Sequence, residues 1–242
     1  MPSYGGYEIR RPHALGSAAS VYEAVSTDGI AGRYALKIFH PPPSTKAKRI
    51  FAIEGWLLAA ERQQAAAKSG PVPLEVRAFG RCDEGAYMVM PWREDAFEAL
   101  YQSLSPKGDT LRVLAAKLFD ALEAWESAYG TPHGKLKPAN VFSEGTGLLS
   151  SRSFRLSDPW YLPNANPAER RRSDLAQIGE MLVRVVRRRA GGAWPIEDAP
   201  EWHVLGRTGT AWREFCNFLL DPNPPGGELT IANARQRLGK IA

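Results

Sequence analysis

The chain has 242 residues, 44% hydrophobic and 24% charged, a composition typical of an ordinary soluble globular protein. This length suffices for one large domain or for two small lobes around one cleft. No apolar run approaches the ~18 residues of a membrane span, and the N-terminal sequence lacks the apolar core of a signal peptide. Cys82 and Cys216 form no CxxC pair, which predicts free thiols in a reducing compartment. We therefore expect a cytoplasmic protein.

The net charge of +5 is a mild basic excess, carried partly by the arginine runs 170–172 and 187–189. Such runs usually form a solvated basic face, and a docking surface for an acidic partner is the alternative. No RNA- or DNA-binding motif accompanies the charge, so nucleic acid is not an expected partner. The alanine- and arginine-rich composition is typical of a GC-rich bacterial genome.

The first ninety residues have the pattern of short strands separated by glycine and proline turns, with one helix among them. The helix, at about 45–68, is rich in alanine, and its apolar residues Ile50, Ile53, Leu57 and Leu58 recur at helical spacing. It is bounded by the prolines at 41–43 on one side and by Pro71 and Pro73 on the other. The expected strands are 7–11, 21–25, 33–40, 75–81 and 86–90, with a small-residue turn at 16–20.

After Pro91 the pattern becomes mainly helical. Residues 111–129 predict a long amphipathic helix with Leu114, Leu118 and Trp125 on one face. Two short apolar segments flank a turn within 141–149, and further helices are expected at 174–189 and 211–220. Five strands around one helix, followed by a mostly helical half, indicate a two-lobed α+β enzyme fold.

In this order the residues resemble the protein kinase family, from about Tyr7 to Leu238. The strongest match is His-Gly-Lys-Leu-Lys-Pro-Ala-Asn at 133–140, which is similar to the catalytic loop H-R-D-L-x-x-x-N. Shorter matches are 15–22 for the glycine-rich turn, 34–37 for V-A-I-K, 87–90 for the strand entering the hinge, 156–158 for the run into D-F-G, and 174–182 for the helix that anchors the large lobe. The resemblance implies a single bilobal kinase-like domain over 1–242. It would have a small antiparallel sheet lobe with one helix at about 1–91, a larger mainly helical lobe at about 92–242, and a shortened activation segment.

The resemblance also implies an ATP site, with or without Mg²⁺, in the cleft between the lobes. A lysine on an apolar strand is costly to bury unless it is paired. Glu54, which follows Lys37 by 17 residues on the next helix, is its expected partner, and snorkelling of Lys37 to solvent is the alternative. The nucleotide-binding positions that the resemblance implies are Gly16, Val21, Ala35, Lys37, Glu54, Met90, Pro91, Arg93, Lys137, Asn140 and Asp158.

Two polar side chains of this set, Asn140 and Asp158, would converge on a divalent ion as oxygen ligands. Turn formation is the alternative role for both residue types. His133 is expected to stabilise its loop. Asp174 is expected to cap its helix or to hold the backbone of the 133–140 loop.

Four departures from the family pattern bear on activity. Lys135 stands at the position of the catalytic aspartate, and a cation cannot accept the proton of a substrate hydroxyl. Only Gly16 remains of the glycine-rich loop, which weakens phosphate binding. Asp158 is followed by proline and tryptophan, which predicts a locked segment. Asp174 follows Asp158 by only 16 residues, too few for the family's peptide-binding platform.

We therefore interpret the sequence as that of a pseudokinase, which signals or scaffolds through protein–protein contacts and holds ATP as a ligand. The first alternative is an active phosphotransferase or nucleotidyl transferase with an atypical mechanism, since phosphoryl transfer relies heavily on positioning and electrostatics. The second is a closed interaction module that binds no nucleotide. Trp194, Trp202 and Trp212 are expected in the core of the large lobe, with a partner surface as the alternative.

Overall fold

The computed structural model describes residues 3–161, 166–189, 194–223 and 229–241. These residues form two compact units, which we call unit 1 and unit 2. Unit 1 contains the chain up to Glu94 together with residues 157–161, and unit 2 contains Asp95–Leu156 and the chain from residue 166 onward. The chain therefore returns to unit 1 for one short segment after the first part of unit 2 has been completed.

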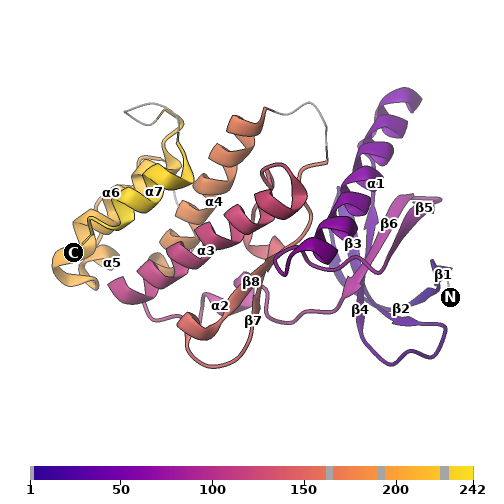
Figure 1. Ribbon diagram of the computed structural model, residues 1–242, viewed down its shortest axis with the longest axis horizontal. Helices are drawn as coiled ribbons and strands as arrows, with labels where there is room; N and C mark the ends of the chain where they lie inside the picture. The colour runs from indigo at the N-terminus through magenta and orange to yellow at the C-terminus, as the bar shows by residue number, and fades with distance from the viewer. Residues whose placement is uncertain (1–2, 162–165, 190–193, 224–228, 242) are drawn as a thin grey trace. The chain divides into compact units, whose positions relative to one another are not determined.

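Unit 1 is built on an antiparallel sheet of six strands in the order β1-β2-β3-β4-β6-β5 (Figure 1). The strands are β1 (Ser3–Tyr4), β2 (Tyr7–Leu15), β3 (Ala19–Ser26), β4 (Tyr34–Phe39), β5 (Ala78–Cys82) and β6 (Gly85–Pro91). All five strands expected from the sequence are present, and β1 is an additional short edge strand. The expected turn at 16–20 also forms, because Leu15 pairs with Ser20 across it. Cys82 pairs with Gly85 across a two-residue hairpin.

The two faces of this sheet carry different residues. One face holds the apolar cluster of Tyr4, Ala24, Tyr34, Leu36, Ile38 and Val89, all at most 8% exposed. Because side chains alternate along a strand, Lys37 and Phe39 of β4 point to the opposite face. The helix α1 (Lys46–Ser69) packs on that face, where Trp56 stacks on Phe39 with ring centroids 5.6 Å apart.

The helix α1 forms where the alanine-rich pattern predicts it, and the Thr45 side chain caps its N-terminus. Its buried stripe is made mainly of small residues around Trp56, and the hydrophobic positions that identified the helix lie partly outside it. Ile50 remains 42% exposed and Leu58 39% exposed. The apolar spacing thus predicts the helix correctly but not the face that it buries, because apolar residues occur on more than one side. The buried residues of α1 are Ala52, Gly55, Trp56, Ala59, Ala60, Gln63 and Ala66.

Unit 2 is mainly helical, with one two-stranded antiparallel sheet. Its elements are α2 (Phe97–Leu100), α3 (Gly108–Tyr129), β7 (Val141–Glu144), β8 (Ser153–Leu156), α4 (Pro167–Arg187), α5 (Pro200–His203), α6 (Gly209–Leu220) and α7 (Ile231–Leu238), with 3-10 turns at Pro138–Asn140, Leu149–Ser151 and Gly206–Thr208. The long helix α3 buries Leu114, Leu118 and Trp125 as its periodicity predicts. The helices α4 and α6 pack so closely that a Cβ on Gly179 would lie 3.1 Å from the Leu219 side chain.

Several arginines of the two runs form ion pairs or hydrogen bonds within unit 2. A solvated basic face would leave these side chains in water. Arg171 forms an ion pair with Glu126 at 2.6 Å, and Arg189 forms one with Glu201 at 3.0 Å. Arg188 donates hydrogen bonds to three backbone carbonyls near the end of α2. Much of the basic charge in these runs therefore stabilises unit 2.

The three C-terminal tryptophans divide between core and surface. Trp202 and Trp212 are buried, at 1% and 0% exposure, as expected for the core. Trp194 is 45% exposed, and its indole N–H donates to the Asn217 carbonyl at 3.2 Å.

Neither cysteine forms a disulfide. Among the described helices, none has the length and apolar character that crossing a membrane requires.

Candidate functional site

Lys37 lies at the centre of a row of predicted nucleotide-binding positions on one face of the sheet. The strand register places Val21 and Met88 directly opposite Lys37, and Met90 directly opposite Ala35. Residues that pair across strands share a face, and so do residues two apart along a strand. Val21, Ala35, Lys37 and Met90 therefore share the face on which α1 packs.

The partner of Lys37 is Asp158, and the expected pairing with Glu54 is wrong. The Lys37 ammonium lies 2.5 Å from a carboxylate oxygen of Asp158, and the two side chains are only 11% and 10% exposed. Glu54 instead pairs with Arg81 of β5, and both of those side chains are more than half exposed. The separation of Lys37 and Glu54 along the chain predicts correctly which helix carries Glu54. It does not predict the direction of the side chain, because each residue along a helix rotates that direction by about 100°. The rotation of α1 turns Glu54 toward β5.

The backbone at Asp158 is held by Gln63 from α1. The fully buried Gln63 side chain accepts a hydrogen bond from the Asp158 N–H at 3.1 Å and donates one to the Leu74 carbonyl at 2.8 Å. Asp158 has φ of 58°, in the left-handed region that aspartate tolerates better than most residues. The carboxylate of Asp158 is therefore positioned by its side-chain partner and by its own backbone.

The residues that follow Asp158 pack against α1 and β4. A Cβ on Gly55 would lie 2.8 Å from the Tyr161 carbonyl oxygen, so α1 approaches this segment backbone to backbone. The Tyr161 ring meets Phe39 edge to face at 5.3 Å and lies roughly parallel to Trp160. We call residues 157–161 the return segment. These contacts and the fixed φ of Pro159 favour the locked arrangement that the sequence predicts.

The turn at 16–19 bonds to itself and to the end of β4. The Gly16 N–H donates to the Ala19 carbonyl at 3.1 Å, and the His40 N–H donates to the Ala18 carbonyl at 2.9 Å. The Ser20 hydroxyl also lies 2.9 Å from Nε2 of His40. The N–H of Gly16 is thus engaged within the turn.

In unit 2, Asp174 holds the backbone of the 133–140 loop. Its two carboxylate oxygens accept hydrogen bonds from the N–H groups of Gly134 at 2.7 Å and Leu136 at 3.0 Å. The second of the two structural roles expected for Asp174 is therefore observed, and α4 begins earlier, at Pro167, with Asn166 as its cap. His133 is fully buried edge to face against Trp125, and its Nδ1 accepts the Lys135 N–H at 3.3 Å.

The remaining loop residues differ in environment. The Asn140 side chain is 1% exposed and donates a hydrogen bond to the Lys135 carbonyl at 3.0 Å, which is the turn-forming role. Its amide oxygen is the group that would bind a metal. Lys135 is partly buried and Lys137 is exposed. Within the described ranges, no group of three or more His, Cys, Asp or Glu side chains is arranged to hold a metal ion.

The predicted positions therefore fall into two sets. Unit 1 contains Gly16, Val21, Ala35, Lys37, Glu54, Met90, Pro91, Arg93 and Asp158, and unit 2 contains Lys135, Lys137 and Asn140. Within unit 1 the structure brings Lys37 and Asp158 into contact and turns Glu54 away from them. Sequence reasoning missed Gln63 and Gly55. Gln63 follows the buried Trp56 by two helical turns, and this spacing is the signal that would have placed it on the buried face.

Because the carboxyl group of Asp174 is buried, we expect the stability of the protein to depend on pH. Burial raises the pKa of Asp174 from 3.8 to about 7, against the opposite effect of the N–H groups of Gly134 and Leu136. The pKa of Asp174 is higher in the folded state than in the unfolded state, so protonation of Asp174 stabilises the fold. This stabilisation is complete below about pH 4 and is lost as the pH rises through about 7. We expect the free energy of unfolding to fall with a slope of up to about 1.4 kcal/mol per pH unit over that window.

Thermal unfolding at several pH values checks this expectation. Asp174→Asn should remove most of the slope, although it lowers the overall stability by leaving one loop N–H without its acceptor. The exposed Asp109 of α3 offers the matched control, and Asp109→Asn should keep the slope of the parent protein. Equal slopes in the parent protein and Asp174→Asn would show that Asp174 does not titrate in this range.

Comparison with known proteins gives a likeness in structure. No protein-family model matches the sequence, and no curated protein matches it. The chain is similar to the crystal structure of the PknI kinase domain of Mycobacterium tuberculosis, with 17% identity, a TM-score of 0.62, and coverage of 100% of this chain and 98% of that one. A cysteine-to-alanine mutant of the same domain aligns with 18% identity, a TM-score of 0.61, and coverage of 98% and 97%. The chain therefore has a protein-kinase-like α+β fold.

Proposed function

We propose that this chain is a pseudokinase, a single kinase-like domain over 1–242 with a small lobe at about 1–91 and a large lobe at about 92–242. The observation that carries this proposal is Lys135 at the position of the catalytic base. An ammonium group has three donors and no acceptor, so it cannot take the proton from an attacking hydroxyl. Ordinary phosphoryl transfer to a protein is therefore lost.

Nucleotide binding is the second part of the proposal. The adenine would contact Val21, Ala35, Met90, Pro91 and Arg93, and the phosphates would meet Lys37, Lys137 and the turn at Gly16. Support comes from the shared sheet face of Val21, Ala35, Lys37 and Met90. Glu54 has no part in this site as we now propose it, because it pairs with Arg81 on β5.

A bound ion would take oxygens from Asp158 and Asn140, which are the hard ligands that Mg²⁺ prefers. The carboxylate of Asp158 already neutralises the Lys37 ammonium at 2.5 Å. An arriving triphosphate would therefore compete with Asp158 for Lys37. Lys135, as an additional cation, would supply part of the charge that Mg²⁺ normally provides, so that ATP binds with or without the ion.

The biological role that we propose is signalling or scaffolding through protein–protein contacts in the cytoplasm. The stretch of 16 residues from Asp158 to Asp174 is too short for the platform on which kinases dock peptide substrates. A chain that holds a nucleotide without transferring its phosphate acts through the shape that the nucleotide stabilises.

Thermal-shift titrations with ATP and ADP, each with and without Mg²⁺, test nucleotide binding. A ligand present at one hundred times its Kd stabilises the folded state by about 2.7 kcal/mol, which raises the Tm by about 5–10 °C for a domain of this size. We expect this shift in the parent protein and not in Lys37→Met. Lys68→Met is the matched control, because Lys68 is an exposed lysine at the end of α1, and it should keep the shift.

The role of Lys135 is tested in the same titration. Lys135→Ala should weaken ATP binding mainly when Mg²⁺ is absent, because the variant lacks the additional cation. Equal ATP affinity of Lys135→Ala and the parent protein, with and without the ion, would contradict this role. No shift at millimolar nucleotide in any condition would favour the interaction module that binds no nucleotide.

An atypical phosphotransferase or nucleotidyl transferase is the second candidate function. The observation that favours it is the position of the Asp158 carboxylate, which is fixed by Lys37 and by Gln63. Phosphoryl transfer depends largely on positioning and charge, so Asp158 or a water molecule would handle the proton. Turnover that disappears in both Lys37→Met and Asp158→Asn, in a preparation free of other kinases, would establish this function and overturn the pseudokinase proposal.

A further inference from the structure

Gln63 of α1 is fully buried and uses both ends of its amide group. Its amide N–H groups donate hydrogen bonds to the Leu74 carbonyl at 2.8 Å and to the Met90 sulfur at 3.8 Å. Its carbonyl oxygen accepts the Asp158 N–H at 3.1 Å. A buried amide whose donors and acceptor all have partners holds those partners in place, because the loss of a buried hydrogen bond is costly. Gln63 thus fastens the first part of the return segment to β6.

These partners require an amide and not a carboxylate. The Leu74 carbonyl needs a donor and the Asp158 N–H needs an acceptor, whereas an ionised carboxylate offers acceptors only. Gln63→Glu would set a negative oxygen against the Leu74 carbonyl and add a second negative charge next to Asp158. The residue of α1 that reaches the return segment here is therefore uncharged.

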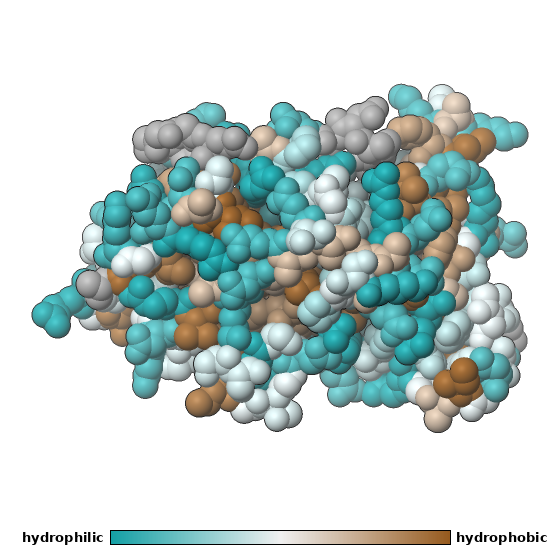
Figure 2. All heavy atoms as spheres, in the orientation of Figure 1, coloured by the Kyte–Doolittle hydropathy of each residue, from teal (hydrophilic) through white to brown (hydrophobic). Residues whose placement is uncertain are grey.

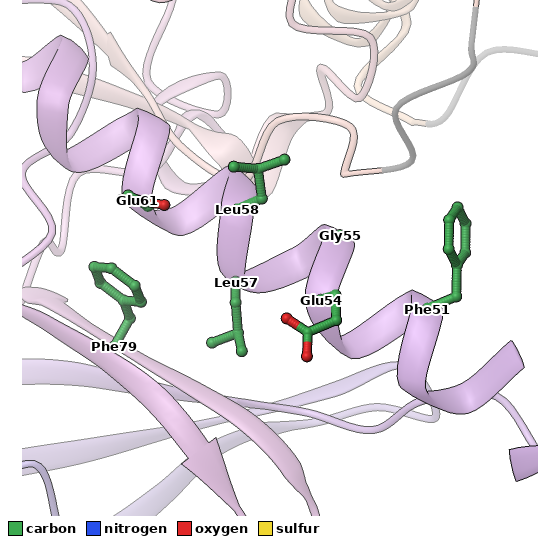
Figure 3. A pocket seen from close by; sticks show the side chains of 7 residues that line it. All are labelled: Phe51, Glu54, Gly55, Leu57, Leu58, Glu61 and Phe79. Atoms are coloured by element: carbon green, nitrogen blue, oxygen red, sulfur yellow. The ribbon is translucent and has the colours of Figure 1, made fainter. Parts of the chain in front are cut away.

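The two acidic residues of α1 lie on a different side of the helix. Glu61 precedes Gln63 by two positions, a rotation of about 200°, and Glu54 lies two helical turns before Glu61 on the same side. Both line a pocket that also contains Phe79 of β5, and Glu54 points toward that strand (Figure 3). The outer side of α1, where hydrophilic and hydrophobic residues lie together (Figure 2), therefore carries these carboxylates, and the buried side does not.

The charges beside Lys37 therefore nearly cancel. Lys37 and Asp158 form their ion pair at 2.5 Å with side chains 11% and 10% exposed, and the α1 residue that bonds to Asp158 is neutral. Mg²⁺ binds through one or two carboxylates together with phosphates, and a carboxylate already paired with an ammonium attracts it weakly. A further carboxylate would repel the phosphates of a nucleotide. The neutral amide thus favours phosphates over a divalent ion.

We propose that Gln63 is the positioning residue of the nucleotide site. It holds the Asp158 carboxylate on Lys37 and, because it is uncharged, lets this pair accept nucleotide phosphates without a metal ion. Gln63 acts through Asp158 and not by touching the nucleotide. Its role rests on the nucleotide binding proposed above, and it assigns the tolerance of metal-free ATP and ADP to one buried side chain.

Thermal-shift titration of Gln63→Glu with ATP, with and without Mg²⁺ at equal ionic strength, tests the charge. The added carboxylate repels free ATP more than ATP whose charge Mg²⁺ partly neutralises. We expect the ratio of the Kd without Mg²⁺ to the Kd with Mg²⁺ to rise by about tenfold over that of the parent protein. Gln64→Glu is the matched control, because Gln64 is the next residue of α1 and bonds to the Val76 carbonyl instead. It adds the same charge and should leave the ratio unchanged.

Gln63→Met tests the hold on Asp158 without a change of charge. Methionine fills a similar space but has no N–H donor and only a weak acceptor. The coupling between Lys37 and Asp158, measured by a double-mutant cycle in urea unfolding, should fall by about half or more in this background. Nucleotide affinity should fall equally with and without Mg²⁺, so that the ratio of the two Kd values stays that of the parent protein.

The results separate this role from nucleotide binding itself. An unchanged ratio in Gln63→Glu, in a protein that nucleotide still stabilises, would overturn the role of Gln63 and leave the nucleotide site intact. An unchanged coupling in Gln63→Met would show that Gln63 serves only the packing of α1. A parent protein that no nucleotide stabilises would remove the nucleotide site and the tolerance of metal-free nucleotide with it. Should Gln63→Glu not fold, the coupling in Gln63→Met decides the proposal alone.

Discussion

Asp158→Asn should lower the free energy of unfolding by about 3 kcal/mol, and adding Lys37→Met should recover most of that loss. Removing one partner of a buried ion pair leaves an uncompensated charge, whereas replacing both partners is often nearly neutral. Asparagine is the suitable replacement because it tolerates the left-handed backbone at φ of 58°. Urea unfolding of the parent protein, both single variants and the double variant gives the coupling energy between the two residues.

Glu54 and Arg81 provide a matched control pair in the same unit, with side chains 54% and 55% exposed. Exposed ion pairs contribute about 0–1 kcal/mol, so Glu54→Gln with Arg81→Met should show little coupling. A Lys37–Asp158 coupling no larger than that of the control pair would contradict the buried arrangement. A large coupling between Lys37 and Glu54 would instead restore the pairing that the resemblance implies.

Gly55→Ala should destabilise the protein by about 2 kcal/mol, although the same change in an ordinary helix stabilises by about 1 kcal/mol. The new Cβ would lie 2.8 Å from the carbonyl oxygen of Tyr161, so α1 or the return segment has to shift. Urea unfolding measures the sign as well as the size of the effect.

The exposed Ala65 of the same helix allows the intrinsic effect to be measured separately. Ala65→Gly should cost about 1 kcal/mol, which is the propensity difference alone. A stabilising Gly55→Ala would show that the return segment does not lie against α1 in solution. In that case the coupling between Lys37 and Asp158 should also be small, so the two experiments check each other.

Much of the fold is predictable because its signals are local. Glycine and proline mark the ends of the strands and of α1, and the apolar periodicity of α3 identifies both the helix and its buried face. The sequence-based prediction starts α4 too late, since the arginines at 170–172 are interpreted as a charged surface run. Asn166 followed by Pro167 is a cap with proline in the first turn, and this local signal corrects the start.

The partners of the site residues are less predictable, because they depend on how elements rotate against each other. Burial makes an acidic partner for Lys37 a sound expectation, but two carboxylates are available to it. The choice between Glu54 and Asp158 is decided by the rotation of α1, which buries Gly55 and Trp56 against the sheet side and the return segment. Small residues dominate that stripe, so a search for large apolar residues selects the wrong face.

The return segment also constrains how unit 1 is made during synthesis. Asp158 lies 64 residues beyond Glu94, which at about 5–20 residues per second is a delay of about 3–13 s on the ribosome. Throughout that interval Lys37 lacks its acidic partner, and Gln63 and Gly55 lack the backbone that covers them. The nascent sheet and α1 are thus an incomplete unit until much of unit 2 has emerged. A fragment ending at Glu94 would correspond to this unfinished stage and not to an autonomous domain.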